Sequence, residues 1–501
     1  MERKYIHRFS EIGDLPFALE YGDIDLKTVH TELSPISDIS LKTYLTNSYP
    51  LNGILVGAPM HTTSEANMCI AMGLSGNCAV LHKNMSIDKQ VEEGKKVKRF
   101  SSGFITEPDT LSPKDTVYKT LAIKKEKGYD SFPITKDGSP HGKLVGLFTK
   151  FYCSEKYKDY KVKEFMIPIE ELKEEGILHS KKLDIHEAEE MMRKNRYGKL
   201  LIVDENGYLE SMSTWADVSK REEFPDAVLD KYDRIKYGAA LGGPGSIKDF
   251  KERSRRLVKE ANVDALFIET AQADSDGVMK KTKKLLDDLV SSYDVPVVYG
   301  NVDNYESASR LASICRDMDA IKVGIGPGSI CTTKQVTGAG IPQLTAVWEC
   351  SKAAKEAGIR CIADGGIGRT PVEASGNAIK AIAAGADTVM VGGLIAGTKE
   401  CPMEPKLNKE GKWVSEYDGM ASPAGLEAGG GTRYYQKGKD AVIQGIEDEV
   451  SFKGSVFDVI REFNKNVRYS KAIHYNIKKI EDLQKADLEF AIKVSVARKV
   501  A

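Results

Sequence analysis

The chain has 501 residues, a length that suggests two or three domains. Its 72 basic and 73 acidic side chains give a formal net charge of -1, which provides no overall field to attract nucleic acid or an anionic membrane. No apolar run approaches the ~20 residues of a membrane span, and the opening segment lacks a signal-peptide core. We therefore expect a cytoplasmic protein that acts on small molecules.

Eight short apolar runs recur along the chain, and polar stretches with helix-like patterns separate them. The runs cover residues 52–60, 77–82, 235–242, 263–270, 295–301, 318–326, 359–366 and 386–393. Runs of this length that are rich in Val, Ile and Ala are typical of buried parallel strands joined by helices. Eight such units close into a (β/α)8 barrel, an α/β fold whose chemistry lies at the C-terminal ends of the strands.

The regular spacing breaks between the second and third predicted strands. From about Thr106 to Lys220 the chain contains two similar copies, TLSPKDTVYKTLAIKKEKGYDSFPITKDG and LHSKKLDIHEAEEMMRKNRYGKLLIVDENG. Each copy offers an amphipathic helix, a short apolar strand and a turn with Asp and Gly. We predict an inserted pair of modules, and two unrelated helix–strand hairpins are the alternative. The predicted division is a barrel built from residues 1–105 and 221–501, with the insertion at 106–220.

The sixth predicted strand leads into GIGPGSICTTKQVTGAGIPQ, residues 324–343, which places Cys331 among glycines and hydroxyl side chains. Glycines allow backbone N–H and C=O groups to approach a ligand closely. The chain's eight cysteines include no Cys-x-x-Cys pair, so we expect neither a disulfide scaffold nor a zinc ribbon. Taken alone, Cys331 is compatible with a nucleophile, a metal ligand or a small apolar filler.

Several motifs in a fixed order resemble the inosine-5′-monophosphate (IMP) dehydrogenase family. They are GIGPGSICTT with VTGAGIPQ, CIADGG, VMVGGLIAGTKE, YDGM and GGGTRYYQ. The likeness runs from about Leu51 to Lys453, and the inserted copies resemble the tandem cystathionine-β-synthase (CBS) modules that this family carries. The resemblance implies NAD-dependent oxidation of IMP to xanthosine monophosphate, a step of guanine nucleotide biosynthesis.

The resemblance also assigns the catalytic residues. Cys331 matches the nucleophile that attacks C2 of the hypoxanthine ring, and Thr333 matches the hydroxyl that helps position the hydrolytic water. The segment Gly429–Gln436 matches a mobile flap, in which Arg433 takes the role of general base beside Tyr434. An arginine normally stays protonated, so residue type alone predicts only a solvated surface pair here.

The nucleotide-binding residues follow from the same resemblance. Ser329 matches a phosphate ligand, Asp364 a ribose ligand and Met60 the residue beside the base. The alternative interpretation of Asp364 is a helix cap for the following turn. The complete predicted set is Met60, Ser329, Asp364, Gly366, Gly392, Gly393, Tyr417, Gly419, Met420 and Gln444.

The chain departs from the family pattern at several of these positions. Gly393 replaces a usual serine, which removes a hydroxyl donor to phosphate, and Asp418 replaces a usual arginine. His61 stands where the family has aspartate, and Gly57 where it has serine. On the NAD side, the family's Asp-Ser-Ser becomes residues 269–271, Glu-Thr-Ala. The predicted cofactor-binding residues are Glu269, Thr270, Asn301 and Gly324.

Family members also bind potassium through loop carbonyls, which here would be those of Gly326, Gly328 and Cys331. The chain ends in VSVARKVA without the family's glycine-containing extension, so we expect an incomplete cation site. The family forms homotetramers through the barrel and octamers through the CBS modules. The cleft of these modules is expected to bind purine nucleotides such as ATP or GTP.

Two other functions stay open. A GMP reductase uses the same barrel, cysteine and threonine to convert GMP to IMP with NADPH, but Arg433 and Tyr434 in a flap favour the dehydrogenase. A catalytically impaired, nucleotide-sensing protein would account for the altered residues on the NAD side. The retained Cys331, Thr333 and Arg433 oppose that reading, because a protein that only binds nucleotide gains nothing from a nucleophile.

Overall fold

The computed structural model describes residues 6–15, 17–32, 35–100, 104–105, 108–180, 183, 185–215, 218, 222–243, 247–290, 293–314, 318–434 and 441–493. The chain forms two compact units. The first comprises Met1–Lys98, Asp226–Val228 and Ile235–Ala501, and the second comprises Arg99–Pro225 and Leu229–Arg234. The predicted limits of the insertion, Thr106 and Lys220, lie outside the described residues.

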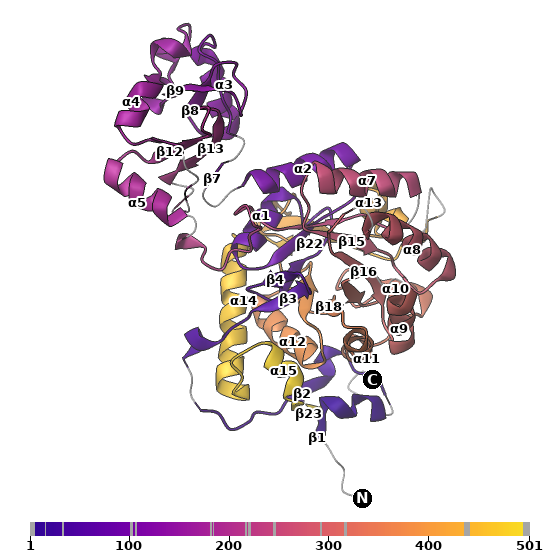
Figure 1. The fold of residues 1–501 in the computed structure, drawn as a ribbon. Helices are drawn as coiled ribbons and strands as arrows, with labels where there is room; N and C mark the ends of the chain where they lie inside the picture. The colour runs from indigo at the N-terminus through magenta and orange to yellow at the C-terminus, as the bar shows by residue number, and fades with distance from the viewer. Residues whose placement is uncertain are drawn as a thin grey trace, which may run out of the picture. The chain divides into compact units, whose positions relative to one another are not determined.

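Eight parallel strands of the first unit close into a barrel, which confirms the predicted (β/α)8 fold. The strands are β5 (Leu55–Gly57), β6 (Cys78–Leu81), β14 (Gly238–Ala240), β15 (Ala265–Glu269), β16 (Val297–Val302), β17 (Ala320–Val323), β18 (Arg360–Asp364) and β19 (Thr388–Val391). Seven lie within the predicted apolar runs, and β16 extends one residue beyond its run, to Val302. The runs are continuous because the barrel interior covers one face of each strand and helices cover the other (Figure 1).

The helices of the first unit surround these strands (Figure 1). They are α1 (Ala66–Leu74), α2 (Ile87–Arg99), α7 (Ile247–Lys259), α8 (Asp276–Val290), α9 (Tyr305–Ile314), α10 (Thr333–Thr337), α11 (Gln343–Glu356), α12 (Pro371–Ala383), α13 (Pro423–Glu427), α14 (Val456–Ser470) and α15 (Glu481–Lys485). Local sequence explains where α12 begins. The Thr370 hydroxyl accepts a hydrogen bond from the Glu373 amide, and Pro371 occupies the first helical position.

Smaller sheets flank the barrel. A three-stranded sheet has the order β1 (Ile6–Arg8), β23 (Glu489–Ile492) and β2 (Ile24–Leu26). A hairpin joins β3 (Thr43–Thr46) to β4 (Tyr49–Leu51). After the last barrel strand the chain forms an antiparallel sheet of β20 (Lys406–Leu407), β21 (Trp413–Asp418) and β22 (Glu447–Ser451). This sheet carries part of the predicted nucleotide site.

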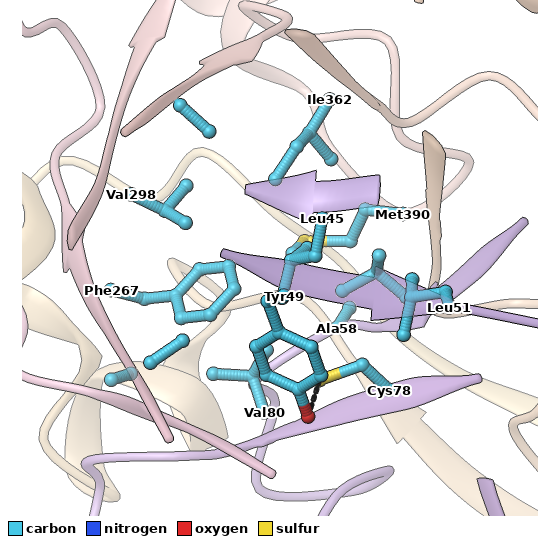
Figure 2. Close-up of a cluster of buried hydrophobic side chains, with 14 of the residues drawn as sticks. Leu45, Tyr49, Leu51, Ala58, Cys78, Val80, Phe267, Val298, Ile362 and Met390 are labelled. Atoms are coloured by element: carbon cyan, nitrogen blue, oxygen red, sulfur yellow. Dashed lines mark hydrogen bonds between the residues drawn. The ribbon is translucent and has the colours of Figure 1, made fainter. Parts of the chain in front are cut away.

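The barrel core reaches directly to the predicted site. The β3–β4 hairpin and the barrel strands share one buried cluster (Figure 2), which includes Leu45, Tyr49, Leu51, Phe267, Val298, Ile362 and Met390. The Tyr49 hydroxyl donates to the Cys78 thiol at 3.5 Å. Met60 packs against this cluster and also against a second one that contains Ile330 and Tyr417. Core packing therefore positions Met60 relative to the loop of Cys331.

The second unit contains two sheets. One has the order β10 (Ile167–Pro168), β9 (Leu144–Phe148) and β8 (Phe132–Thr135), and the other has the order β11 (Leu178–His179), β12 (Lys199–Val203), β13 (Leu209–Thr214) and β7 (Phe104–Ile105). The helices are α3 (Val117–Lys127), α4 (Ile169–Glu174) and α5 (Ile185–Asn195). Both copies of the repeat show the predicted helix, strand and turn, and the turn glycines Gly138 and Gly207 have φ of 80° and 81°. Sequence analysis missed β9 and β13, which pair with β8 and β12.

No helix among the described residues of either unit is long and apolar enough to cross a membrane.

The packing of the barrel core predicts how a substitution there changes the free energy of unfolding. Phe267→Ala removes a fully buried ring from the cluster in Figure 2, and should lower the free energy of unfolding by about 3–5 kcal/mol. Urea denaturation followed by circular dichroism measures this loss. Val372→Ala is the control, because this α12 side chain is 73% exposed and its truncation should cost at most about 0.5 kcal/mol. A loss below about 1 kcal/mol for Phe267→Ala would contradict the core assignment.

Candidate active site

The loops at the C-terminal ends of the barrel strands enclose a pocket that contains most of the predicted site residues. The predicted residues that line it are Met60, Glu269, Asn301, Gly324, Gly326, Gly328, Cys331, Asp364, Gly392, Tyr417, Gly419, Met420, Arg433, Tyr434 and Gln444. Those that do not line it are Thr270, Ser329, Thr333, Gly366 and Gly393. Residues that are distant in sequence thus meet at one end of the barrel, as expected for this fold.

Cys331 lies in this pocket, in a loop that backbone hydrogen bonds hold in place. Its amide donates to the Gly328 carbonyl at 3.0 Å, and the neighbouring Thr332 amide donates to the Gln444 carbonyl at 3.0 Å. The thiol lies 3.1 Å from the Thr333 hydroxyl. Cys331 is partly exposed, whereas the other cysteines among the described residues are buried; Cys315 lies outside them. Its accessibility favours chemistry over a packing role.

A buried lysine that sequence analysis missed organises the pocket floor. Lys322 comes from β17, and its side chain is only 1% exposed. Its ammonium donates to Asn301 Oδ1 and to Asp364 Oδ2, each at 2.6 Å, and lies 3.0 Å from Glu269 Oε1. The Asn301 amide also donates to Asp364 Oδ2 at 2.9 Å. The available signal was a charged residue inside an apolar strand, because such a side chain needs buried partners.

This cluster keeps Asp364 ionised. Burial by itself would raise the pKa of Asp364, but attraction to Lys322 and Arg433 outweighs burial and holds the pKa below its usual range. An ionised carboxylate at the pocket wall accepts hydrogen bonds from hydroxyl groups. Asp364 therefore ends β18 as an acceptor that faces the pocket, and the interpretation as a helix cap is not needed.

The flap residues Arg433 and Tyr434 lie in a short 3₁₀ helix, Gly430–Tyr434, at the pocket mouth. The Arg433 guanidinium lies 3.1 Å from Glu269 Oε2, and its backbone carbonyl accepts a hydrogen bond from the Ala271 amide at 3.0 Å. Burial raises the pKa of Tyr434 to about 12, so its hydroxyl stays protonated. The last residues of the predicted flap motif, 435 and 436, lie outside the described residues.

The predicted NAD-side residues fit the cofactor only in part. Glu269, Asn301 and Gly324 line the pocket, but the carboxylate of Glu269 is shared between Lys322 and Arg433. The buried Thr270 hydroxyl donates to the Gly300 carbonyl at 2.8 Å, away from the pocket. The Glu269 carboxylate therefore already has two cationic partners in this structure.

The predicted potassium ligands are carbonyls of the cysteine loop. The Gly328 carbonyl accepts the hydrogen bond from the Cys331 amide. The C-terminal segment 494–501 lies outside the described residues. The potassium site therefore stays a prediction.

Two departures from the family pattern face each other. His61 follows Met60, Asp418 lies between Tyr417 and Gly419, and His61 Nε2 is 3.6 Å from Asp418 Oδ2. Burial, with repulsion from Glu416 and Glu447, raises the pKa of Asp418 to about 6. Burial and the nearby charge of His82 lower the pKa of His61. The distance indicates an ion pair, but both shifts favour the neutral forms, so burial outweighs the attraction.

This environment predicts a pH-dependent effect of Asp418 on stability. A carboxyl whose pKa is raised by folding destabilises the protein above the folded pKa, and the cost disappears as pH falls from about 6 to about 4.

Asp418→Asn should therefore melt about 2–4 °C above the unchanged protein at pH 7.5 and show a smaller difference at pH 5. Thermal unfolding by circular dichroism measures both. Asp458→Asn, an exposed carboxyl on α14, is the control and should show no such pH-dependent gain. A lower melting temperature for Asp418→Asn at pH 7.5 would mean that ionised Asp418 stabilises the fold through His61.

Known proteins are similar to this chain in sequence and in fold. The family model described as the IMP dehydrogenase / GMP reductase domain matches residues 18–499. The chain is 37% identical over 450 residues to inosine-5′-monophosphate dehydrogenase of Pasteurella multocida, covering 89% of this chain and 88% of that protein. It is 36% identical over 472 residues to the enzyme of the same name from Aquifex aeolicus, covering 93% and 91%.

Solved structures give the same result. A variant of GMP reductase from Trypanosoma brucei, in complex with guanosine 5′-monophosphate, has a TM-score of 0.85 and 30% sequence identity over 97% of both chains. A complex of the reductase from the same organism with guanosine 5′-triphosphate has a TM-score of 0.77 and 28% identity, over 97% of this chain and 99% of the other. With the barrel, the cysteine loop and these similarities together, the chain belongs to the IMP dehydrogenase / GMP reductase family.

Proposed function

We propose that the protein oxidises IMP to xanthosine monophosphate with NAD, through a covalent intermediate on Cys331. The observation that carries the proposal is the partly exposed Cys331 thiol in the pocket, 3.1 Å from the Thr333 hydroxyl and enclosed by Arg433 and Tyr434. Identity of 36–37% to IMP dehydrogenases over about nine tenths of the chain supports it.

The pocket walls suit a purine nucleoside monophosphate. Met60 and Met420 offer apolar surface for the base, and ionised Asp364 accepts hydrogen bonds from ribose hydroxyls. The glycines that follow β18 and β19 allow backbone N–H groups to approach the phosphate. These contacts orient the ring so that its C2 atom lies against Cys331.

The covalent step uses the thiolate of Cys331, which adds to C2 of the hypoxanthine ring and forms a C–S bond. Oxidation at C2 requires an acceptor for the hydride that C2 loses, and a bound NAD would supply it; the purine would thereby be oxidised and the cofactor reduced. Water then adds to C2 of the thioimidate, the C–S bond breaks, and xanthosine monophosphate leaves as Cys331 regains its proton. Thr333 lies close enough to the sulfur to hydrogen-bond that water.

Arg433 serves hydrolysis as a protonated group in the arrangement observed. Burial by itself would lower its pKa, but the charges of Glu269 and Tyr434 raise the pKa above its ordinary value. The guanidinium therefore keeps its proton while it is paired with Glu269 at 3.1 Å. Arg433 can orient the water by donating a hydrogen bond, and accepting a proton requires that it first separate from Glu269.

Glu269 then serves both halves of the reaction. In this structure it lines the pocket and pairs with Arg433, and a bound cofactor would contact it after the flap has moved away. The two uses exclude each other because Lys322 already occupies the other carboxylate oxygen. Cofactor departure and flap closure are therefore linked through one carboxylate.

A GMP reductase is the second candidate, and the TM-score of 0.85 to a GMP-bound reductase favours it. Arg433 and Tyr434 beside Cys331 favour the dehydrogenase, because hydrolysis needs a positioned water and reduction does not. Formation of NADH from IMP and NAD, set against consumption of NADPH with GMP, separates the two. IMP binding without either reaction would support the nucleotide-sensing alternative.

The second unit is proposed to be a tandem CBS module that binds purine nucleotides and pairs homotetramers into octamers. Two copies of a helix–strand–turn pattern support this, and a similar reductase has been crystallised with guanosine 5′-triphosphate. Addition of ATP or GTP to the intact chain, with activity and sedimentation measured together, tests both points.

The first functional prediction concerns the nucleophile. Cys331→Ala should bind IMP with near-unchanged affinity but form less than about a hundredth of the normal NADH, a barrier increase above ~3 kcal/mol. Cys350→Ala is a control with a buried thiol outside the pocket. More than about a hundredth of normal turnover in Cys331→Ala would exclude covalent chemistry at this residue.

The second separates the two chemical steps. Because only hydrolysis uses Arg433, Arg433→Ala should release a burst of about one NADH per site and then stall, with a purine nucleotide adduct on Cys331 in the intact mass. Arg461→Ala, an exposed arginine on α14, should show normal steady turnover. Slow turnover without burst or adduct would show that Arg433 has no role in hydrolysis.

A further inference from the structure

Arg369 extends from the loop between β18 and α12 toward the expected phosphate end of the nucleotide site. Its Nε donates to the Ser329 hydroxyl at 3.0 Å, and its Cζ lies 5.8 Å from the centre of the Tyr417 ring. An arginine that sequence analysis did not select thus contacts two predicted nucleotide-binding residues.

The arginine occupies the space that a side chain at position 393 would need. A Cβ on Gly393 would lie 2.9 Å from Arg369 Cγ and 3.7 Å from Arg369 Cα. Cγ is close to the backbone and cannot move far without moving the whole side chain. A serine at 393 and Arg369 in its observed position therefore exclude each other, so the missing hydroxyl and the arginine are one coupled feature.

The surrounding charges leave the guanidinium able to bind an anion. Its Nη1 donates to Asp448 Oδ2 at 2.6 Å, Nη2 has only a long contact of 3.5 Å with the Ser329 carbonyl, and the Glu373 carboxylate accepts from the Arg369 amide at 3.0 Å. Lys453 adds a second cation, since its ammonium donates to the carbonyls of Arg369, Gly393 and Leu394. Burial lowers the pKa of Lys453 to about 8, which keeps it mostly protonated at neutral pH.

We propose that Arg369 binds the 5′-phosphate of the substrate nucleotide, in place of the hydroxyl that Gly393 lacks. The proposal rests on the nucleotide site described under Proposed function. The Nη2 group, whose contact with the Ser329 carbonyl is long, is the donor that faces the fewest competing acceptors. A charged hydrogen bond from it to a phosphate oxygen contributes more than the neutral serine it replaces. Through Arg369, in the loop between β18 and α12, the site thereby distinguishes nucleoside monophosphates from nucleosides.

The test compares binding of IMP and of inosine, which lacks the phosphate. Both affinities are measured by equilibrium dialysis with Cys331→Ala, which cannot turn over, with and without Arg369→Gln. Arg369→Gln should weaken IMP binding about 10- to 100-fold and leave inosine binding within about twofold. Equal losses for the two ligands, or no loss for IMP, would overturn the proposal.

Asp448→Asn provides a matched control, because it breaks the same ion pair but keeps the guanidinium. Asp448→Asn should leave the affinity for IMP unchanged or raise it. A loss of IMP affinity equal to that of Arg369→Gln would mean that Arg369 acts only by joining its loop to β22, and would overturn the proposal. Equilibrium dialysis measures the binding of IMP and is independent of its oxidation. Failure of IMP oxidation with the expected binding pattern would refute the proposed reaction alone.

The steric coupling has its own test. Gly393→Ser should displace Arg369 and weaken IMP binding, whereas Gly393→Ser combined with Arg369→Ala has room for the serine. The double variant should bind IMP better than the sum of the two single losses predicts. Additive losses would show that the two positions are independent and would overturn the inference that arginine takes the place of the hydroxyl.

Discussion

The ammonium of Lys322 is the contact on which the rest of the site depends. A lysine that is 1% exposed is stable only when its charge is fully paired, and its partners come from the ends of three other barrel strands. Glu269, Asn301 and Asp364 are therefore held in one cluster, whatever occupies the pocket. This cluster fixes the ionised carboxylate of Asp364 on one side. On the other side it fixes Arg433 of the flap, through Glu269. The barrel strands provide a rigid support, and the residues that carry out the chemistry lie on the loops at the strand ends.

Much of the fold and of the cysteine loop was predictable because they depend on local patterns. Continuous apolar runs predict buried parallel strands wherever they occur, and glycine-rich loops after strands mark the functional end of a barrel. The second strand of each module, β9 or β13, was missed because it follows the turn and lies outside the helix–strand–turn pattern that the two copies share. The Thr270 side chain was assigned to the cofactor from the family pattern, and in this structure its hydroxyl donates to a backbone carbonyl.

The contacts that sequence analysis could not predict join residues far apart in the chain. Arg369 pairs with Asp448, 79 positions later, and His61 faces Asp418 from a different part of the fold. His61 and Asp418 depart from the family pattern, whereas nothing in the sequence marks Arg369 or Asp448, and periodicity carries no information on which partner each residue meets. Lys322 is the exception, since a lysine within an apolar strand already predicts buried acidic or amide partners.

The departures from the family pattern bear on whether the protein is an active enzyme. Loss of function would leave altered residues with no relation to one another, whereas here they occur in spatial pairs. Gly393 makes the space that Arg369 fills, and the carboxylate at 418 faces the imidazole at 61. Glu269 keeps contact with both Lys322 and Arg433 despite its longer side chain. The steric fit of Gly393 with Arg369, and the two contacts that Glu269 keeps, support the proposed enzyme over a protein that only senses nucleotide.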